Sequence, residues 1–154
     1  MEYIRAFRDE HRFLSNFWPV QLVFGSWLFA SAEHAYQAAK SLDPKNWAKV
    51  QACRSPVAAK RLGKNLALRP DWEDVKLEVM TEILTAKFED PYLRQMLLDT
   101  GDTILVEGNT WGDTFWGSCR GKGENHLGRI LMNIRTDIRI NKLVNQERIG
   151  TWTE

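Results

Sequence analysis

One stretch of the chain carries an unbroken amphipathic pattern, and this pattern limits the folds that the chain can adopt. From about residue 71 to residue 89, apolar side chains recur every three or four positions, which is the spacing of one face of an α-helix. The residues of this face are Trp72, Val75, Val79, Ile83 and Ala86, with Met80 and Leu84 beside it. Asp71 is suited to cap such a helix. We therefore predict a long helix whose apolar face lies in the core.

Start and stop signals divide the rest of the chain into shorter elements. Further helices are predicted to begin at Ser31, Pro44, Ser55-Pro56, Pro91 and Asn125. The last of these is long, and its predicted buried stripe consists of Leu127, Ile130, Leu131, Ile134 and Ile138. Strands are predicted at residues 3–7 and 103–107, and a hairpin over residues 20–29 turns at Gly25-Ser26. This order favours a helix-rich α+β domain with a small antiparallel sheet, and not a βαβ repeat.

Length and composition favour a single domain of residues 1–154 and exclude several classes of protein. The net charge of +1 gives no general attraction to nucleic acid, so such a contact would need a local basic patch. No apolar run approaches the roughly 20 residues of a membrane span, and the first residues do not read as a signal peptide. Cys53, Cys119 and the three histidines fit no metal spacing. We expect a cytoplasmic protein with reduced thiols, no metal site and no cofactor.

The densest group of polar and aromatic residues lies in the second sixth of the chain. The segment Phe13-Leu-Ser-Asn-Phe-Trp18 is followed by Ser31-Ala-Glu-His-Ala-Tyr-Gln-Ala-Ala-Lys40, in which Glu33 falls in the first turn of a predicted helix. A carboxylate there favours the helix dipole, so a surface role is one reading of Glu33. The small and aromatic neighbours instead suggest partial burial, where a carboxylate must be paired or functional. We therefore interpret Glu33 as a functional residue and His34 as its structural neighbour.

Two further segments place a carboxylate close to an indole. Asp71-Trp72 begins the long helix, and Asp113 and Trp116 lie in a loop of glycines and aromatic residues, a kind of segment that often carries binding groups. Carboxylates beside indoles can hold a planar base and a developing sugar cation, which points to glycosidic chemistry on a nucleotide-like ligand. The alternatives stay open at this point: Asp113 could serve a turn beside a core indole, and Trp72 could belong to the core.

A Gly-rich turn, Gly121-Lys-Gly-Glu-Asn-His-Leu-Gly128, leads into the last predicted helix. Its backbone amides and Lys122 could cradle a phosphate. The turn does not match a P-loop, no strand–helix–strand unit surrounds it, and a flexible loop is the alternative. A separate basic cluster, formed by Arg61, Lys64 and Arg69, precedes the long helix. This cluster could contact phosphate or form a solvated face.

Together these segments resemble the YbiA-like family, whose members are also called NADAR domains. The resemblance runs from about residue 3 to residue 136, in the right order and spacing, while residues 140–154 look like a peripheral tail. Its motifs are Phe13-Leu-Ser-Asn-Phe, the Ser31–Lys40 segment, Ser55-Pro-Val-Ala-Ala-Lys-Arg-Leu-Gly, Arg69-Pro-Asp-Trp, Val75-Lys, Ala86-Lys-Phe, Thr100-Gly-Asp, Leu105-Val-Glu-Gly, Asp113-Thr-Phe-Trp-Gly, Gly121-Lys-Gly-Glu-Asn-His-Leu-Gly-Arg and Leu131-Met.

The resemblance implies a YbiA-like fold and an N-glycosidase that cleaves the bond between a ribose anomeric carbon and a nitrogen. The functional carboxylates and indoles of the family would fall on Glu33, Trp72, Asp113 and Trp116, and all four are present. Breaking this bond passes through a state that resembles an oxocarbenium ion, which a fixed carboxylate stabilises. We expect Glu33 to act as acid/base or to activate water, and Asp113 to hold ribose or water, with the two roles exchangeable.

The same resemblance suggests which residues bind the substrate. They are Asn16, Phe17, Trp72, Trp116, Arg69, Lys122, Gly123 and Asn125. The two indoles would stack on base and ribose, and Asn16 would hydrogen-bond a ribose or a base edge. Lys122 and the amides of the Gly-rich turn would hold phosphate, with Arg69 as a helper.

Two substrate classes follow from the resemblance. One consists of phosphoribosylated aminopyrimidine intermediates of riboflavin synthesis, and the other is ADP-ribose attached to guanine in nucleic acid. In the second case the domain acts as an antitoxin, and a chain that begins close to its first motif favours that case. The expected partners are ADP-ribosylated nucleic acid or another ribosyl-nucleotide substrate and a cognate ADP-ribosyltransferase toxin, with no membrane. A non-catalytic sensor of NAD or ADP-ribose is a further alternative, and the intact pair of Glu33 and Asp113 counts against it.

Overall fold

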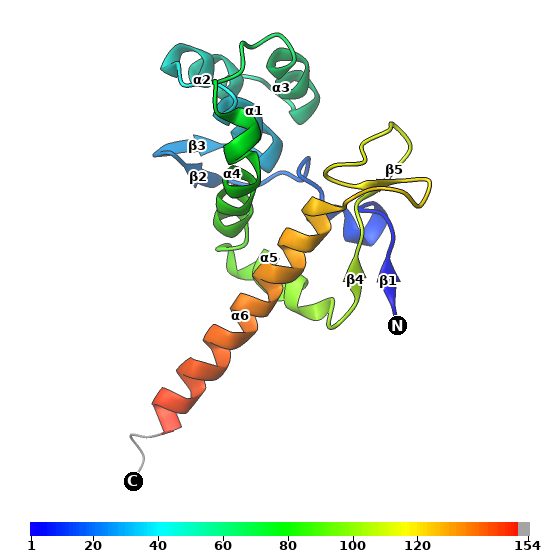
Figure 1. Cartoon of the computed structure of the whole chain (residues 1–154). Coiled ribbons are helices and arrows are strands. Elements are labelled where there is room, and N and C mark those ends of the chain that lie inside the picture. The colour runs from blue at the N-terminus through cyan, green and yellow to red at the C-terminus, as the bar shows by residue number, and fades with distance from the viewer. Residues whose placement is uncertain (151–154) are drawn as a thin grey trace. The chain divides into compact units, whose positions relative to one another are not determined.

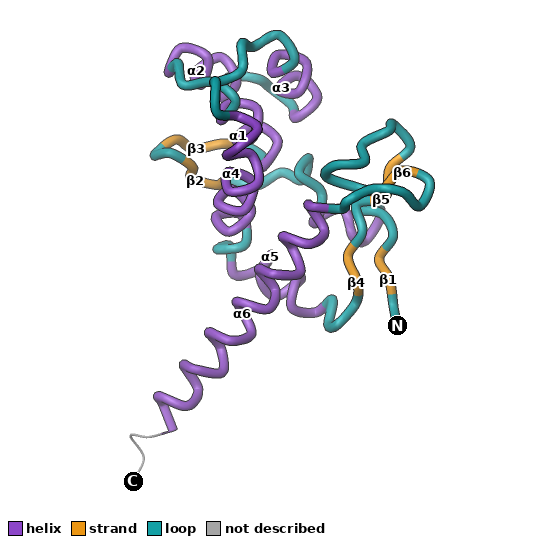
Figure 2. The backbone as a smooth tube through the Cα atoms, in the orientation of Figure 1, coloured by secondary structure: helices purple, strands orange, loops and turns teal. Residues whose placement is uncertain are grey.

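The computed structural model describes residues 1–150, so the last four residues of the predicted tail, 151–154, lie outside the described residues. The chain forms two compact units. The first unit combines Met1–Phe7 with Pro91–Glu154, and the second unit is Arg8–Asp90. Figure 1 labels most of the elements, and Figure 2 distinguishes helices from strands by colour.

The second unit is mainly helical, with one small hairpin. Its elements are a 3-10 helix η1 (Asp9–Leu14), strands β2 (Leu22–Phe24) and β3 (Trp27–Phe29), and helices α1 (Ala32–Ala39), α2 (Pro44–Gln51), α3 (Pro56–Gly63) and α4 (Trp72–Lys87). Helix α1 packs against α2, α3 and α4, and β2 packs on α4. Helix α1 is therefore the element around which this unit is built.

Local signals explain where these elements begin. The side chains of Ser31, Asp43 and Ser55 each accept a hydrogen bond from a backbone amide in the first turn of α1, α2 and α3. Each bond satisfies a donor that the helix itself leaves without a partner. The predicted hairpin is confirmed, because β2 and β3 pair antiparallel around Gly25 and Ser26, which both have positive φ. Positive φ at both turn positions is what a two-residue hairpin loop of type I′ requires.

The apolar face of α4 is buried as predicted, with one addition and one correction. Five members of the predicted stripe are buried: Trp72, Val79, Met80, Ile83 and Leu84. The addition is Lys87, which lies on the same face and is also buried. The correction concerns the cap, because Asp71 makes no side-chain hydrogen bond to the helix and instead pairs with Arg69. The Arg69 guanidinium binds both oxygens of this carboxylate, a bidentate contact that a single backbone amide cannot offer.

The first unit combines short strand pairs with two helices. Its elements are β1 (Tyr3–Ile4), α5 (Pro91–Asp99), β4 (Ile104–Leu105), β5 (Gly108–Asn109), β6 (Ser118–Cys119) and α6 (His126–Gly150). Strands β1 and β4 pair parallel, as do β5 and β6. Helix α6 packs against α5 and β4.

The predicted helix-rich α+β class is confirmed, while the strands differ in detail from the small antiparallel sheet that was predicted. Among residues 1–150 the strands form separate two-stranded pairs, and only the β2–β3 hairpin is antiparallel. The predicted strands at residues 3–7 and 103–107 shrink to two residues each. After β4, the backbone at Gly108 passes so close to the Arg5 carbonyl oxygen that a Cβ would collide with it.

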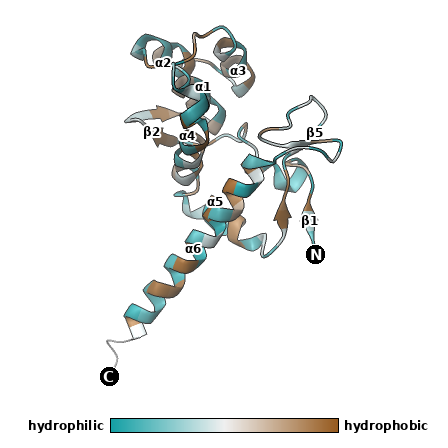
Figure 3. Cartoon of the chain, in the orientation of Figure 1, coloured by the Kyte–Doolittle hydropathy of each residue, from teal (hydrophilic) through white to brown (hydrophobic). Residues whose placement is uncertain are grey.

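Helix α6 is partly buried in its first half and exposed in its second half. Its first half buries Leu127, Ile130, Leu131 and Ile134 as predicted, while Ile138 is only partly buried. Residues 140–150 continue the helix and are all exposed, and Figure 3 shows apolar bands among the polar ones there. Within residues 1–150, no helix combines the length and the apolar character that crossing a membrane requires.

Candidate active site

Glu33 is held at the start of α1 by contacts on both its backbone and its side chain. Its amide donates to the Asn16 carbonyl oxygen at 3.0 Å, which satisfies a donor that the helix leaves without a partner. Its carboxylate oxygen Oε1 accepts from Nε2 of Gln37, one turn later, at 2.7 Å. Only 7% of the residue is exposed. The structure thus places Glu33 in the interior of the second unit, as the sequence predicted.

The surroundings of Glu33 act on its protonation in opposite directions. Burial raises its pKa from the ordinary value, because the charged form loses its hydration. The hydrogen bond from Gln37 and the positive charges of Lys60 and Lys40 act against this effect and lower the pKa. Burial also lowers the pKa of Lys40, which the nearby Glu33 partly restores. A buried carboxyl group near two lysines is suited both to giving up a proton and to facing a positive charge.

Two buried acceptors beside Glu33 have no donor among the residues that the structure describes. They are Oε1 of Gln37 and Oδ1 of Asn16. The amide nitrogens of the same side chains are engaged, with Glu33 in one case and with Met80 Sδ at 3.5 Å in the other. A buried acceptor without a donor costs free energy, and ligand hydroxyl or N–H groups are suited to satisfy it. This arrangement agrees with the predicted role of Asn16 in binding a ribose or a base edge.

Two lysine amines lie close to aromatic rings in this unit. The Lys40 amine lies 5.2 Å from the centre of the Tyr36 ring, and the Lys60 amine lies 5.9 Å from that of Phe17. Trp72 lies against Tyr36, with ring centroids 5.3 Å apart and planes tilted by 53°. Only 4% of Trp72 is exposed, so its ring serves the core of this unit. Contact of Trp72 and Phe17 with substrate stays a prediction.

His34 and Arg69 have structural partners in this unit. The His34 ring contacts Ser31 Oγ at 2.6 Å and the Cys53 carbonyl oxygen at 3.0 Å, which agrees with its interpretation as a structural neighbour of Glu33. The Arg69 guanidinium donates to both carboxylate oxygens of Asp71, at 2.6 and 3.0 Å. The predicted phosphate contact of Arg69 would therefore compete with Asp71.

In the first unit, the Asp113 side chain organises the loop that carries it. Its Oδ1 accepts from the amides of Phe115 and Trp116, at 3.1 and 2.9 Å. Its own amide and carbonyl oxygen are both bound by the Asn109 side chain. The Trp116 ring lies edge-on to Phe115, with centroids 4.8 Å apart. Asp113 thus has the turn function that the sequence left open, and its contact with ribose or water stays a prediction.

The Gly-rich turn is built around the side chain of Asn125. Its Oδ1 accepts from the Glu107 amide and its Nδ2 donates to the Leu105 carbonyl oxygen, both at 2.9 Å. Gly123 has a φ of 149° and lies so close to the Gly117 carbonyl oxygen that a Cβ would collide with it. Lys122 is exposed on the turn. Asn125 and Gly123 therefore have clear structural functions, and their predicted contact with phosphate remains a prediction.

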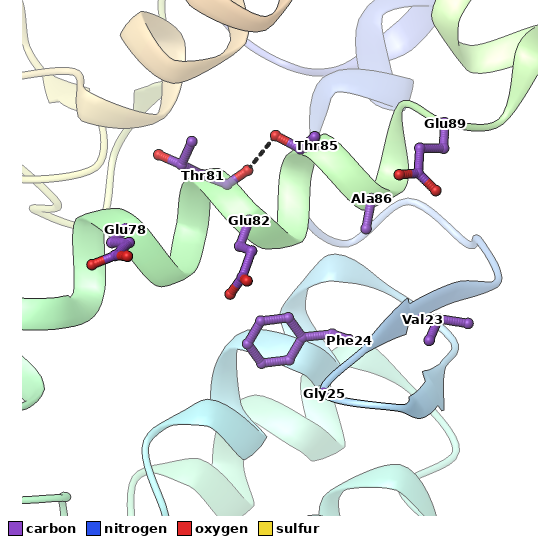
Figure 4. A pocket seen from close by; sticks show the side chains of 9 residues that line it. All are labelled: Val23, Phe24, Gly25, Glu78, Thr81, Glu82, Thr85, Ala86 and Glu89. Carbon is purple, nitrogen blue, oxygen red and sulfur yellow. Dashed lines mark hydrogen bonds between the residues drawn. The ribbon is translucent and has the colours of Figure 1, made fainter.

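A groove of about 600 Å³ lies elsewhere in the second unit, between β2 and α4 (Figure 4). Its walls include Phe24, Glu78, Glu82 and Glu89, and the Glu82 side chain extends toward the Phe24 ring. None of the predicted site residues lines it. Three carboxylates would repel the phosphates of a nucleotide, so this groove is poorly suited to the predicted substrate.

Comparison with known proteins decides the family. The sequence profile of the NADAR domain matches residues 3–139, which is most of the chain and includes parts of both units. The chain belongs to the NADAR domain family. Its relatives include the N-glycosidase YbiA of Escherichia coli strain K12, which is 40% identical over 140 residues, or 87% of this chain and 86% of the relative. An N-glycosidase of Nostoc punctiforme is 40% identical over 81% of this chain and 84% of its own length.

Further relatives and a solved structure agree with this assignment. A riboflavin biosynthesis protein of Vibrio vulnificus is 39% identical over 84% of this NADAR chain, but the match spans only 36% of that longer protein. The NMR structure of Escherichia coli YbiA matches with a TM-score of 0.82 and 36% identity, covering 93% of this chain and 89% of that one. The YbiA-like fold is thereby confirmed, and the chain is an N-glycosidase.

Three side chains of the Glu33 site in this NADAR domain were not predicted. They are Gln37, Lys40 and Lys60. Spacing could have identified the first two, because residues four and seven positions after Glu33 lie on the same face of α1. Lys60 comes from α3, and no local pattern connects a residue of one helix with a carboxylate on another.

Removal of the Lys60 charge is expected to raise the pKa of Glu33 further. The positive charge of Lys60 favours the ionised Glu33 carboxylate and so lowers its pKa, whereas burial raises this pKa. Lys60→Gln removes the first effect, and a larger fraction of Glu33 is then protonated at a given pH. The check is an NMR titration of the Glu33 carboxyl carbon. Lys64→Gln is the matched control, because Lys64 follows the same helix and has no comparable influence on Glu33. An unchanged or lower pKa in Lys60→Gln would contradict this description of the site.

Proposed function

We propose that this NADAR domain hydrolyses the N-glycosidic bond between ADP-ribose and guanine in nucleic acid. The observation that supports this most strongly is the state of Glu33, a buried carboxyl group with a raised pKa beside Lys60 and Lys40. Its place in a water-poor interior makes its charge effective, because few water dipoles screen it there. Glu33 is therefore the residue to which we assign the chemistry.

In the proposed reaction, the bond between the ribose anomeric carbon and the guanine nitrogen breaks and one water molecule is consumed. The bonding electrons leave with the nitrogen, which takes up a proton, while the water oxygen bonds to the anomeric carbon. The ribose becomes positively charged as the bond breaks, and the Glu33 carboxylate stabilises this charge more than the neutral ground state. In its protonated form the same group can supply the proton to the leaving nitrogen.

The choice of an ADP-ribosyl substrate rests on the charges and acceptors around Glu33. Lys40 and Lys60 both lie close enough to influence its titration, and Lys64 likewise influences Lys40. Several lysines near one carboxyl group suit a pyrophosphate better than a single phosphate. The acceptors of Asn16 and Gln37 suit ribose hydroxyl groups or the N–H groups of a base.

A second candidate is the hydrolysis of phosphoribosylaminopyrimidine intermediates of riboflavin synthesis. The observation that favours it is the match to riboflavin biosynthesis proteins of Vibrio vulnificus and Arabidopsis thaliana, which are 39% and 42% identical over the matched parts. Those proteins are much longer than the matched region, which spans 36% and 18% of them. The chemistry at Glu33 would be the same, and only the leaving group and the number of phosphates would differ.

The proposed activity also suggests a partner. An enzyme that removes ADP-ribose from guanine reverses the action of a nucleic-acid ADP-ribosyltransferase, so we propose that this domain serves as antitoxin to such a toxin in the cytoplasm. Co-expression with a candidate toxin provides the cellular test. Rescue of growth by the wild type but not by Glu33→Gln supports the pairing, and equal rescue by both proteins would point to sequestration in place of hydrolysis.

The experiment that tests the proposed function compares the two substrates directly. The protein is incubated with an oligonucleotide that carries ADP-ribosylated guanine and, separately, with a phosphoribosylaminopyrimidine. We expect release of free ADP-ribose from the first and little ribose 5-phosphate from the second. The reverse pattern would establish the riboflavin-type reaction. Tight binding of ADP-ribose without turnover of either substrate would identify a sensor and overturn the proposal.

Trp116→Ala is expected to weaken the binding of ADP-ribose by about 1–3 kcal/mol, the usual contribution of an aromatic ring stacked on a base. The prediction follows from the proposed contact of the Trp116 indole with the base or ribose. Isothermal titration calorimetry measures the affinity. Trp111→Ala is the matched control, because Trp111 lies in the same loop and is 64% exposed. Equal affinity of Trp116→Ala and wild type would remove Trp116 from the binding site.

A further inference from the structure

The motif Ala86-Lys-Phe at the end of α4 has no place in the chemistry described so far. Its lysine, Lys87, is only 1% exposed, although lysine is among the residues that are almost never fully buried without a partner. Burial lowers the pKa of the Lys87 amine to about 7. Removing this amine from water lowers the stability of the folded state, which indicates that the amine has a function.

The Lys87 amine is directed at the backbone just before Asn16. It donates to the Ser15 carbonyl oxygen at 2.9 Å and lies 5.2 Å from the centre of the Phe88 ring. The Ser15 hydroxyl in turn accepts from the Phe17 amide at 3.1 Å. The amine thus holds a segment that connects η1 to the predicted site residues Asn16 and Phe17.

A second residue of α4 contacts the same segment two turns earlier. Met80 lies seven positions before Lys87, so both side chains emerge from the same face of the helix. The Met80 sulfur accepts from Nδ2 of Asn16, while Lys87 binds the carbonyl oxygen of the preceding residue. Helix α4 therefore holds Asn16 at two points. Met80 binds the Asn16 side chain, and Lys87 binds the peptide group that joins Ser15 to Asn16.

One further hydrogen bond links the held segment to the backbone of Glu33. The Asn16 carbonyl oxygen accepts from the Glu33 amide at 3.0 Å, and Oδ1 of Asn16 is the buried acceptor without a donor among the described residues. A shift of the Ser15–Asn16 peptide would move this acceptor and release the Glu33 amide together. Displacements of about 1 Å in a positioned group can cost about a hundredfold in rate.

We propose that Lys87 is a positioning residue of this glycosidase, which fixes the Ser15–Asn16 peptide so that the Asn16 carboxamide meets the substrate beside Glu33. The inference rests on the proposed function for its catalytic consequence. Lys87 acts through Asn16 and not on the reacting atoms, because its amine is bound to the Ser15 carbonyl oxygen and only 1% of the residue is exposed.

The test replaces Lys87 with methionine, which keeps an unbranched chain of similar volume and removes the amine. Since the buried amine is costly, Lys87→Met is expected to unfold at a temperature no lower than that of the wild type. Its kcat is expected to fall by about tenfold or more through the misplacement of Asn16. In an Asn16→Ala background the same change should lower kcat by less than about threefold, because two residues that act together are not additive. Lys76→Met is the matched control, because Lys76 lies on the same helix and its amine pairs with the exposed Glu73.

A second readout is independent of activity. Hydrogen exchange at the Glu33 amide reports on its bond to the Asn16 carbonyl oxygen, and we expect its protection to fall by about tenfold in Lys87→Met while core amides keep theirs. Unchanged protection at Glu33 would overturn the proposal, as would equal losses of kcat in both backgrounds. If the wild type turned over neither substrate, the proposed function would fail, and the exchange at Glu33 would still decide whether Lys87 holds this segment.

Discussion

Glu33→Gln is expected to lower the turnover number by at least about a hundredfold, the usual contribution of an acid–base group. The introduced amide keeps an oxygen that can accept from Gln37, as Glu33 Oε1 does at 2.7 Å. It removes the negative charge that stabilises the ribosyl cation and the proton that the carboxyl group can supply. Steady-state kinetics on the ADP-ribosylated oligonucleotide measures the effect, with Glu82→Gln as an exposed control on α4. Turnover close to that of the wild type would remove Glu33 from the chemistry.

The raised pKa of Glu33 also predicts how the stability of Glu33→Gln differs from that of the wild type as pH changes, and this prediction does not depend on turnover. The folded-state pKa of Glu33 is raised above its ordinary value of 4.5, so the folded state binds more protons than the unfolded state between these two pKa values. The free energy of unfolding of the wild type therefore falls as pH rises through this window. Glu33→Gln has no group that titrates at this position, so its free energy of unfolding lacks this fall. The difference in free energy of unfolding between the variant and the wild type should therefore shift in favour of the variant as pH rises from low to neutral. A constant difference across the pH range would contradict the raised pKa.

Gly128→Ala is expected to destabilise the first unit by about 1–3 kcal/mol or more, the usual effect of overpacking a tight site. A Cβ at this position in the first turn of α6 would collide with the Leu105 carbonyl oxygen and with both terminal atoms of the Asn125 side chain. The Leu105 oxygen belongs to the backbone and cannot rotate away. The added methyl group should therefore break the Asn125 bridge between Leu105 and Glu107.

Thermal and urea unfolding, followed by circular dichroism, measure this effect. Arg129→Ala is the control, because Arg129 is the next residue of α6 and is exposed. A free energy of unfolding for Gly128→Ala within about 0.5 kcal/mol of the wild type would show that the turn adapts to the methyl group, since that is the range of ordinary surface substitutions. The Asn125 bridge would then not constrain the Gly-rich turn.

The sequence predicts the helices of this protein well because their ends carry local chemistry. Ser31 and Ser55 cap their helices through a single side chain and a nearby amide, so no distant contact is needed to place these starts. The apolar face of α4 is equally local, since its spacing alone fixes which side is buried. Burial of Glu33 follows from the small residues around it on α1.

Other features depend on contacts that the sequence does not record. Asp71 has the right position for a cap, but Arg69 offers it a charged partner instead. Asp113 binds backbone amides of its own loop, and Asn125 binds backbone groups 18 and 20 positions earlier in the chain. Composition cannot distinguish either function from ligand binding. Burial of Lys87 depends on a carbonyl oxygen 72 positions earlier in the chain. Each outcome is set by the tertiary structure and not by a local pattern.

The most direct test of the central claim is hydrolysis in water labelled with ¹⁸O, using the ADP-ribosylated oligonucleotide and mass spectrometry of both products. Cleavage of the ribosyl C–N bond predicts one ¹⁸O atom in the released ADP-ribose, in the hydroxyl group on the anomeric carbon, and an oligonucleotide with unmodified guanine. Glu33→Gln should give neither product at a comparable rate. Release of AMP, with the label on phosphate, would show cleavage of the pyrophosphate and would contradict the account.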